Sequence, residues 1–334
     1  MFKLNLLGVV GGLYIGKPII AILALFIALL LDLVYPYHKG ILLSVHPVHT
    51  SFKLSRYLVK NYGTKSYGII MWFICTITHL LFAALVLKIC WTINYVLWIL
   101  AIACILKVSF SLKLLIDIAL NVVKYLEKEP NKARFWAQQL VRRNVYKLDE
   151  AHVLSATIES LAESICDGFI SPLFYYPFFG PLAPLLQRIA NALDSSVGYK
   201  APPFKDVGWF SAKADTIINY IPARLTAIYI ILSSAILKYN WREALKVYLR
   251  DRCKTESLNA GHPMAAIAGS LEIKLEKIGF YTIGRGAKEI EANDVRKAIN
   301  IIKVVALLHL TFLIFLILTL NALVSCLWPI TSLP

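Results

Sequence analysis

Three uncharged stretches, at 67–87, 89–106 and 304–328, constrain this fold more than any other feature of the sequence. A hydrocarbon core of roughly 30 Å needs about 20 apolar residues in a helix, so each stretch predicts a transmembrane helix. Only Lys88 separates the first two, which predicts a tight helical hairpin. The third predicts a C-terminal membrane anchor.

The composition leads to the same conclusion. Residues of the AVILMFWYC set make up 58 % of the chain and charged residues 16 %, whereas soluble domains have about 45–50 % and about 25 %. The net charge of +15 would suggest nucleic acid in a soluble protein. Basic residues also crowd the cytoplasmic loops of membrane proteins. We therefore predict an integral membrane protein with the lipid bilayer, and no nucleic acid, as its partner.

Further segments have a less regular pattern. Residues 19–31 form an apolar core that 6–15 extend, and we expect a first span here. Residues 169–186 are uncharged but contain four prolines, which predicts a broken and even re-entrant segment. Residues 217–237 are long enough to cross, yet Arg224 lies in their first third. The sequence thus predicts about four to six membrane segments.

Charge asymmetry predicts the orientation. Residues 37–66 contain five basic residues and no acid, which places them in the cytoplasm. Residues 107 onward are then cytoplasmic again, and 238–303 are strongly basic as well. The segments at 169–186 and 217–237 must therefore both cross or both fail to cross, and the sequence leaves this open.

The stretch at 108–168 has a helical pattern. We expect one helix from Ser109 to Pro130, a short one after Asn131, and a third that Asp149 caps and that ends at Gly168. No strand alternation is evident. The predicted fold is all-α and polytopic with cytoplasmic helices. We expect one membrane-embedded domain over 1–334, with three N-terminal spans in 1–107, a motif-bearing catalytic region in 108–302 and a C-terminal span in 303–334.

Three carboxylates form the first polar cluster. Glu159, Glu163 and Asp167 are spaced by four residues, which places them on one helical stripe. Like charges on one stripe repel unless a cation shares them. A solvated helix face is the ordinary explanation; the alternative is a magnesium site, because Mg²⁺ binds carboxylate oxygens and substrate phosphates together.

Other polar residues form two short groups, at 191–200 and at 215–219. Asn191 and Asp194 are one helical turn apart, and Lys200 follows them. Asp215 and Asn219 are four residues apart. Each of these pairs has an ordinary interpretation as part of a loop or a helix face.

The remaining candidates are single residues. Arg224 follows Pro222 and is either an interfacial anchor or a phosphate ligand. Asn259 precedes a helix of small residues at 265–271 that indicates close packing. His46 begins a His-Pro-Val tripeptide without a third metal ligand at a recognisable spacing, which favours a structural or phosphate-contact role.

As a set, these residues resemble the CobD/CbiB family of cobalamin biosynthesis, the adenosylcobinamide-phosphate synthases, which are polytopic membrane proteins. The resemblance runs from about Leu29 to about Ile301 and follows the family's motif order: ALLLDL at 28–33, HPV at 46–48, ES-x-AE-x3-DG-x3-PLF at 159–174, N-x-LDS-x2-GYK at 191–200, GW at 208–209, D-x3-N-x2-PARLT at 215–226 and NAG-x3-AA-x-AG at 259–269. The chain departs from the family at Ser164, Ala214 and Leu258, and at 34–36.

The resemblance implies a reaction. Adenosylcobyric acid, through a peripheral propionate carboxyl, condenses with the amine of 1-aminopropan-2-ol phosphate or a related amino alcohol. ATP is the co-substrate and Mg²⁺ the cofactor. It also implies a multi-pass protein of the cell membrane whose site faces the cytoplasm. A homo-oligomer and an assembly with other cobalamin-pathway enzymes both stay open.

Residue chemistry then suggests individual roles. We expect Glu163, Asp167 and Asp194 to hold Mg²⁺, Lys200 and Arg224 to hold phosphate groups, and Glu159 or Asp215 to accept the amine proton. The remaining substrate-binding residues are His46, Asn191, Asn219 and Asn259. We expect the segments 159–171, 191–200, 215–224 and 259–263 to converge on one polar cavity near the cytoplasmic membrane face.

Two other functions compete with this one. AmpE-like membrane proteins are similar to the family and act as sensors without known ligase chemistry, but a sensor has no need of carboxylates, a lysine and amides in four separate segments. A small transporter would carry its charges inside long spans. The carboxylates here lie outside the three clear spans.

Overall fold

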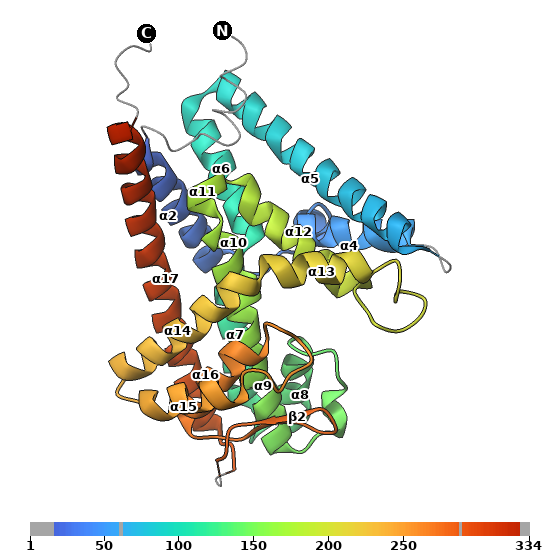
Figure 1. Ribbon diagram of the computed structural model, residues 1–334, viewed down its shortest axis with the longest axis vertical. Helices are drawn as coiled ribbons and strands as arrows, with labels where there is room; N and C mark the ends of the chain where they lie inside the picture. The colour runs from blue at the N-terminus through green and yellow to red at the C-terminus, as the bar shows by residue number, and fades with distance from the viewer. Residues whose placement is uncertain (1–16, 60–62, 287–288, 328–334) are drawn as a thin grey trace. The chain divides into compact units, whose positions relative to one another are not determined.

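The computed structural model describes residues 17–59, 63–286 and 289–327, most of which are helical (Figure 1). The chain folds as two compact units that are interleaved in sequence. The first comprises 1–111, 171–218 and 310–334, and the second comprises 112–170 and 219–309. The boundaries of these units at 111 and 309 lie four and seven residues after the region bounds expected at 107 and 302, and 171–218 belong with the N-terminal helices. That the chain acts as one domain stays a prediction.

The first unit is a helical bundle. α2 packs on α6, and α12 packs on α4, α5, α6 and α13 (Figure 1). Tyr176 ties α11 to α2, because its buried hydroxyl donates to the Ala21 carbonyl at 3.0 Å. The elements of this unit are α2 (Pro18–Val34), α3 (Gly40–Ser44), α4 (Pro47–Leu58), α5 (Lys65–Ile93), α6 (Tyr95–Ser109), α10 (Ser171–Phe174), α11 (Tyr176–Phe179), α12 (Leu182–Val197), α13 (Trp209–Ile218) and the C-terminal part of α17 (Ala292–Leu327).

The predicted hairpin exists, but its turn lies six residues later than expected. α5 continues through Lys88 and ends at Ile93, and Asn94 separates it from α6. Lys88 does not break the helix, because lysine is a good helix former whose long side chain can reach polar surroundings. The Asn94 Oδ1 accepts the Val96 N–H at 2.7 Å and caps α6.

The proline-rich segment is broken as predicted. α10 and α11 contain only four residues each, and a regular helix resumes with α12 at Leu182. Ser171, Leu173 and Tyr176 are buried in the protein. Irregular backbone at membrane depth is tolerated where protein surrounds it.

The second unit contains the helices α7 (Lys113–Tyr125), α8 (Pro130–Gln138), η1 (Val145–Lys147), α9 (Glu150–Ile165), η2 (Cys166–Ile170), α14 (Tyr220–Ile236), α15 (Trp241–Asp251), α16 (Gly261–Leu271) and the N-terminal part of α17, with the strands β1 (Leu275–Lys277) and β2 (Tyr281–Ile283). α16 packs against α14, α15 and α9. A Cβ on Gly269 would lie 2.5 Å from the Glu243 carbonyl oxygen. The small residues of α16 therefore serve close packing, as predicted.

One expectation for this unit is wrong. Asp149 does cap α9, accepting the His152 N–H at 2.8 Å, but the chain does not stop at Gly168. It passes through the π-turn η2 directly into α10. The unit also contains the short antiparallel pair β1–β2, in which Leu275 faces Ile283. Strands of three residues are too short for alternation to reveal them.

In the part of the chain that the structure describes, three helical segments are long and apolar enough to cross a membrane, at 65–93, 95–125 and 292–323, or four if α13 and α14 form one bent span. Among the described residues, α2 is apolar but has only 17 residues. Its proposed extension at 6–15 lies outside the described residues. The terminal helix α17 begins at Ala292, twelve residues before the uncharged run at 304–328. Its first turns carry charged side chains, so the uncharged run marks only the later part of the helix. The fold is thus all-α and multi-pass.

Candidate functional site

The predicted site residues divide between the two units. His46, Asn191, Asp194, Lys200 and Asp215 belong to the first unit, and Glu159, Glu163, Asp167, Asn219, Arg224 and Asn259 belong to the second. Each group is described within its own unit. A single cavity shared by all four motif segments stays a prediction.

In the first unit, two motifs meet through an amide. The Asn191 Nδ2 on α12 donates to the Asp215 Oδ1 on α13 at 3.2 Å. Arg188, one turn earlier on α12, donates through Nη1 to the Asn191 Oδ1 at 3.4 Å. The amide therefore orients both a guanidinium and a carboxylate, and Arg188 joins the candidate site.

The end of α12 explains the glycines of the neighbouring motifs. A Cβ on Gly198 would lie 2.0 Å from the Asp194 Oδ1, and a Cβ on Gly208 would lie 1.8 Å from the Val197 carbonyl oxygen. Gly198 thus makes room for the Asp194 carboxylate, which is partly exposed, and Lys200 is exposed two residues later. Both glycines are required because a Cβ at either position would clash with a neighbouring oxygen atom. Their presence in the motifs is therefore explained without any contact with substrate.

His46 lies at the start of α4, where it acts as the helix N-cap. Its Nδ1 accepts the Val48 N–H at 3.2 Å, so the neutral ring carries its proton on Nε2. Burial first, and then the positive charges of His38, Arg188, Lys107 and His49, lower the pKa of His46 to about 3. The ring is therefore a neutral hydrogen-bond donor at pH 7, and this tautomer has no free nitrogen for a metal.

A buried ion pair lies in the same unit. The Lys107 Nζ on α6 is 2.8 Å from the Asp32 Oδ1 on α2, and both side chains are almost fully buried. Asp32 is the aspartate of the ALLLDL motif. Intramembrane charges are rare and pair with one another where they occur, so this contact explains why an acid stands at the end of an apolar helix.

In the second unit, three side chains surround the Glu159 carboxylate. The Arg143 Nη2 lies 3.2 Å from both oxygens, the Ser155 Oγ donates to Oε1 at 2.7 Å, and the Tyr281 Oη donates to Oε2 at 2.7 Å. Glu159 is only 5 % exposed. Ser155 also accepts the Glu276 N–H at 2.9 Å, which joins the β1–β2 hairpin to α9. The Tyr281 hydroxyl on β2 is one of the donors to Glu159, so this carboxylate helps to hold the hairpin against α9. Its oxygens already accept hydrogen bonds from several donors.

We expect Tyr281→Phe to lower the free energy of unfolding by about 1.5–3 kcal/mol, because the substitution removes a hydrogen bond to a buried carboxylate. Burial and the charge of Glu159 raise the pKa of Tyr281, so the hydroxyl is protonated and donates at neutral pH. Thermal unfolding of the detergent-solubilised protein measures the loss. Tyr146→Phe is the control, since Tyr146 is 51 % exposed. Equal stability of both variants would show that the contact contributes nothing.

Glu163 and Asp167 continue the stripe on α9 and η2. Glu163 is exposed and Asp167 partly so. The π-turn changes the helical spacing at Asp167, and such turns often occur at functional sites. Within 17–59, 63–286 and 289–327, no three His, Cys, Asp or Glu side chains form a group that could hold a metal ion. Mg²⁺ commonly takes one or two carboxylates with water and substrate phosphate, so carboxylates are the type of ligand it uses, and the assignment of Glu163, Asp167 and Asp194 stays a prediction.

Arg224 is held in place by α14 and by the loop before α16. Its guanidinium carbon lies 3.3 Å from the centre of the Tyr220 ring, and its Nη1 donates to the Tyr220 carbonyl at 2.7 Å and to the Asn259 Oδ1 at 3.4 Å. No carboxylate in the described part of the chain pairs with Arg224. The guanidinium is thus oriented by neutral groups and keeps its charge available for an anion.

His262 follows Asn259 by three residues and extends this group. It is 5 % exposed, and its Nδ1 lies 3.1 Å from the Tyr248 Oη. Burial first, and then the charges of Arg224 and Arg252, lower the pKa of His262 to about 4. Two guanidinium charges therefore act on one neutral imidazole. Asn219 is buried in the break before α14.

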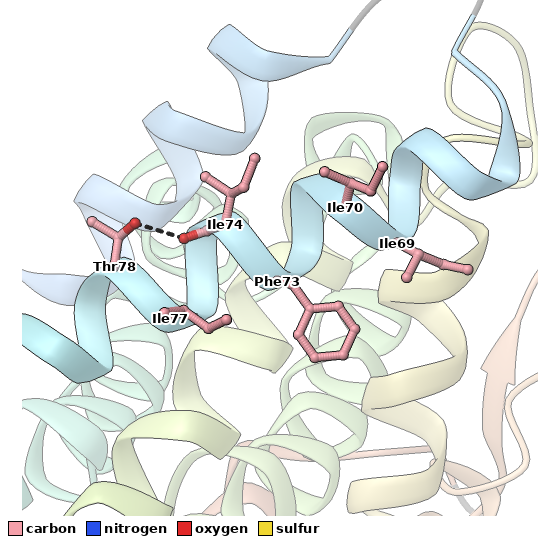
Figure 2. A pocket seen from close by; sticks show the side chains of 6 residues that line it. All are labelled: Ile69, Ile70, Phe73, Ile74, Ile77 and Thr78. Atoms are coloured by element: carbon pink, nitrogen blue, oxygen red, sulfur yellow. Dashed lines mark hydrogen bonds between the residues drawn. The ribbon is translucent and has the colours of Figure 1, made fainter.

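An apolar hollow on α5 contains none of the predicted residues. Its volume is about 380 Å³, and Ile69, Ile70, Phe73, Ile74, Ile77 and Thr78 line it (Figure 2). The Thr78 hydroxyl donates to the Ile74 carbonyl at 2.7 Å and so offers no free donor to the hollow. Such a lining suits lipid chains and carries no chemistry.

Sequence reasoning missed several polar residues. Arg143, Tyr281 and Arg188 lie outside the recognised motifs, and no spacing signal points to them. Lys107 ends the apolar run at 89–106, and nothing in the sequence marks it as the partner of Asp32. His262 could have been found, because it lies inside the small-residue motif, three positions after Asn259.

Comparison with known proteins decides the family. The family model described as CobD/Cbib protein matches residues 25–311. The chain belongs to the CobD/CbiB family. A CobD/CbiB protein from Aeropyrum pernix, described as a probable cobalamin biosynthesis protein CobD, is 40 % identical over 272 residues, which cover 81 % of this chain and 85 % of the relative.

Two bacterial members of the CobD/CbiB family are similar over a shorter range. The cobalamin biosynthesis protein CobD of Clostridium perfringens is 42 % identical over 57 % of this chain and 63 % of its own length. That of Dehalococcoides mccartyi is 40 % identical over 58 % of this chain and 62 % of its own length. No solved structure matches the chain.

Proposed function

We propose that this protein acts in cobalamin biosynthesis as an amide-forming ligase that condenses adenosylcobyric acid with 1-aminopropan-2-ol phosphate, or a related amino alcohol, at the expense of ATP. Family membership supports the role in cobalamin biosynthesis. The observation that carries the ligase activity is the pairing of polar residues from motifs far apart in sequence: Asn191 with Asp215, and Arg224 with Asn259. Polar pairs that join separate motifs are typical of a substrate site.

The proposed chemistry has two steps. A propionate oxygen attacks the γ-phosphorus of ATP and ADP leaves; the amine nitrogen then attacks the acyl carbon, phosphate leaves, and the amine loses a proton. Positioning and charge neutralisation account for most of such a phosphoryl transfer. Mg²⁺ bound by Glu163, Asp167 and Asp194 would neutralise the phosphate oxygens.

Asp215 is the better proton acceptor of the two proposed carboxylates. The oxygens of Glu159 already accept from Arg143, Ser155 and Tyr281. Glu159 is also only 5 % exposed, so a substrate amine has little access to its oxygens. Asp215 lies beside Asn191 and is partly exposed. We therefore assign the amine proton to Asp215.

The decisive experiment measures product and ADP with the full chain in lipid nanodiscs. We expect adenosylcobinamide phosphate and ADP in equal amounts when ATP, Mg²⁺, corrinoid and amino-alcohol phosphate are all present, and neither when any one is omitted. A protein that binds corrinoid but forms no product under these conditions would be a sensor or binding protein instead.

Arg224→Lys tests the phosphate role within this function. Lysine keeps the charge but lacks the planar, bidentate guanidinium. We expect unchanged membrane insertion and a loss of about 1.5–3 kcal/mol of transition-state stabilisation, which is roughly tenfold or more in kcat/KM. Kinetics identical to the parent would show that Arg224 is only an interfacial anchor. Arg242→Lys, on an exposed part of α15, is the matched control.

A further inference from the structure

A polar hollow in the second unit contains none of the predicted site residues. Its volume is about 380 Å³, and residues 238–240, 270–272 and Lys297 line it. They come from the turn between α14 and α15, the end of α16 and the first turns of α17, and all belong to one unit. Small-molecule sites commonly have volumes of about 300–1,000 Å³. The hollow lies at the lower end of this range and therefore suits a small ligand.

Two residues of the lining adopt a backbone conformation that favours glycine. Lys238 follows α14 with φ 59°, and Glu272 follows α16 with φ 56°. Glycine is the usual residue at such a position after a helix, because a Cβ is strained there. The chain nevertheless has a charged residue at both positions, and both residues line the same hollow. Helix capping therefore does not explain these two residues, which indicates a role for their side chains.

The charged groups of the hollow are available to a ligand. In the part of the chain that the structure describes, the ammonium groups of Lys238 and Lys297 have no ion-pair or hydrogen-bond partner. The Glu272 Oε1 accepts the Asn240 Nδ2 at 3.0 Å, and the Asn240 Oδ1 accepts the Glu243 N–H at 3.0 Å. The carboxylate is thus held from one side, while its second oxygen has no partner among the described residues.

The lining combines both signs of charge, which defines the ligand class. Two lysines and one glutamate give it a formal charge of +1, and the C-terminal ends of α14 and α16 add partial negative charge. The carboxylate and the helix ends disfavour a simple anion, and the lysines disfavour a simple cation. A phosphate monoester carries a charge of about −1.5 to −2 at neutral pH. With an ammonium group on the same molecule, the net charge is about −1 and complements the lining.

We propose that this hollow binds a small phosphate monoester that also carries an ammonium group, such as the phosphate of an amino alcohol. Lys238 and Lys297 bind the phosphate oxygens, and Glu272 binds the ammonium group. The hollow is a second site, because Asn259 precedes α16 and Glu272 follows it, and the eleven residues of this helix span about 16 Å. 1-Aminopropan-2-ol phosphate belongs to the ligand class, but the inference rests on the lining and not on the proposed function.

Three substitutions test the hollow in the full chain in detergent. Lys297→Gln removes one ammonium group, and Glu272→Gln removes the carboxylate charge but keeps an oxygen for Asn240. Lys238→Gly removes the other ammonium group and relieves the left-handed backbone. Lys303→Gln, an exposed charge further along α17, is the control. Titration calorimetry measures the binding of O-phosphoethanolamine, with inorganic phosphate and ethanolamine as separate probes.

We expect the parent and Lys303→Gln to bind O-phosphoethanolamine equally, and each of the three variants to bind it about tenfold more weakly. Inorganic phosphate and ethanolamine are each expected to bind the parent at least about tenfold more weakly than the ester, because each leaves part of the lining without a partner. Lys238→Gly is expected to melt no lower than the parent, so that its loss of binding does not come from a damaged fold. Parental affinity in all three variants, or inorganic phosphate that binds as tightly as the ester, would overturn the proposal.

The Arg224→Lys background separates the hollow from the proposed active site. Binding that persists in this background and weakens with Lys297→Gln belongs to the hollow. Binding that weakens with Arg224→Lys alone, and not with Lys297→Gln, would place the ester at the active site and refute the hollow. Neither result depends on turnover. A chain that forms no amide product but binds the ester through Lys297 would refute the proposed function and leave the hollow standing.

Discussion

Replacement of Asp167 or Asp194 by asparagine is expected to abolish formation of adenosylcobinamide phosphate, with a loss on the order of a thousandfold in kcat/KM. Asparagine keeps the size of the side chain but removes the anionic oxygen that Mg²⁺ prefers. A metal ion at a phosphoryl group supplies several kcal/mol of charge stabilisation, and each 1.36 kcal/mol corresponds to about tenfold in rate. Product formation with the full chain in nanodiscs measures the loss.

Structure predicts that these variants still fold. Both carboxylates are partly exposed, so neither substitution leaves a buried charge without compensation. Glu129→Gln serves as the control, because Glu129 is an exposed acid whose ion pair with Lys132 lies on the surface. Partial recovery at high Mg²⁺ would support a weakened metal site. Near-parental turnover in both aspartate variants, at equal expression, would remove them from the metal assignment.

The part of the fold that could be predicted follows from the hydropathy of long segments of the sequence. The uncharged runs predicted α5, α6 and α17 as membrane helices, and the proline spacing predicted the breaks at α10 and α11. Boundaries were less predictable, because one charge in an apolar run does not end a helix. Lys88 shows this, since α5 continues to Ile93.

The π-turn and the β-hairpin could not be predicted, for a different reason. At Gly168 the local sequence favours a helix end, but the buried residues Phe169 and Ile170 continue the chain into α10. The β1–β2 hairpin depends on contacts far away in sequence, such as the one between Ser155 and Glu276. Tertiary contacts of this kind leave no periodic signal.

The candidate site was predictable only where a motif carried it. Asn191, Asp215, Arg224 and Asn259 stand out in the sequence as polar residues of short motif segments, and the structure pairs them two by two. Their further partners do not stand out. Arg188 is an ordinary basic residue in sequence, and its contact with Asn191 depends on the helical register of α12.

The second large effect concerns the buried pair of Asp32 and Lys107. We expect Lys107→Met to lower the free energy of unfolding by about 3–5 kcal/mol, because it leaves a buried carboxylate without its cation. Methionine fills similar volume and is apolar, so the lost charge dominates over lost packing. Thermal unfolding in detergent, followed by size-exclusion chromatography, measures the change.

The double variant Asp32→Asn with Lys107→Met separates charge from packing. Breaking a buried ion pair by removing one partner is costly, whereas replacing both partners by neutral residues is often nearly neutral. The double variant is therefore expected to recover most of the stability that Lys107→Met loses. Lys113→Met, whose partner Asp117 lies one turn away on α7 and remains partly exposed, is the matched control with a loss of at most about 1 kcal/mol. If Lys107→Met were as stable as this control, or if the double variant were no better than the single one, the pair would not hold α2 to α6 through its charges.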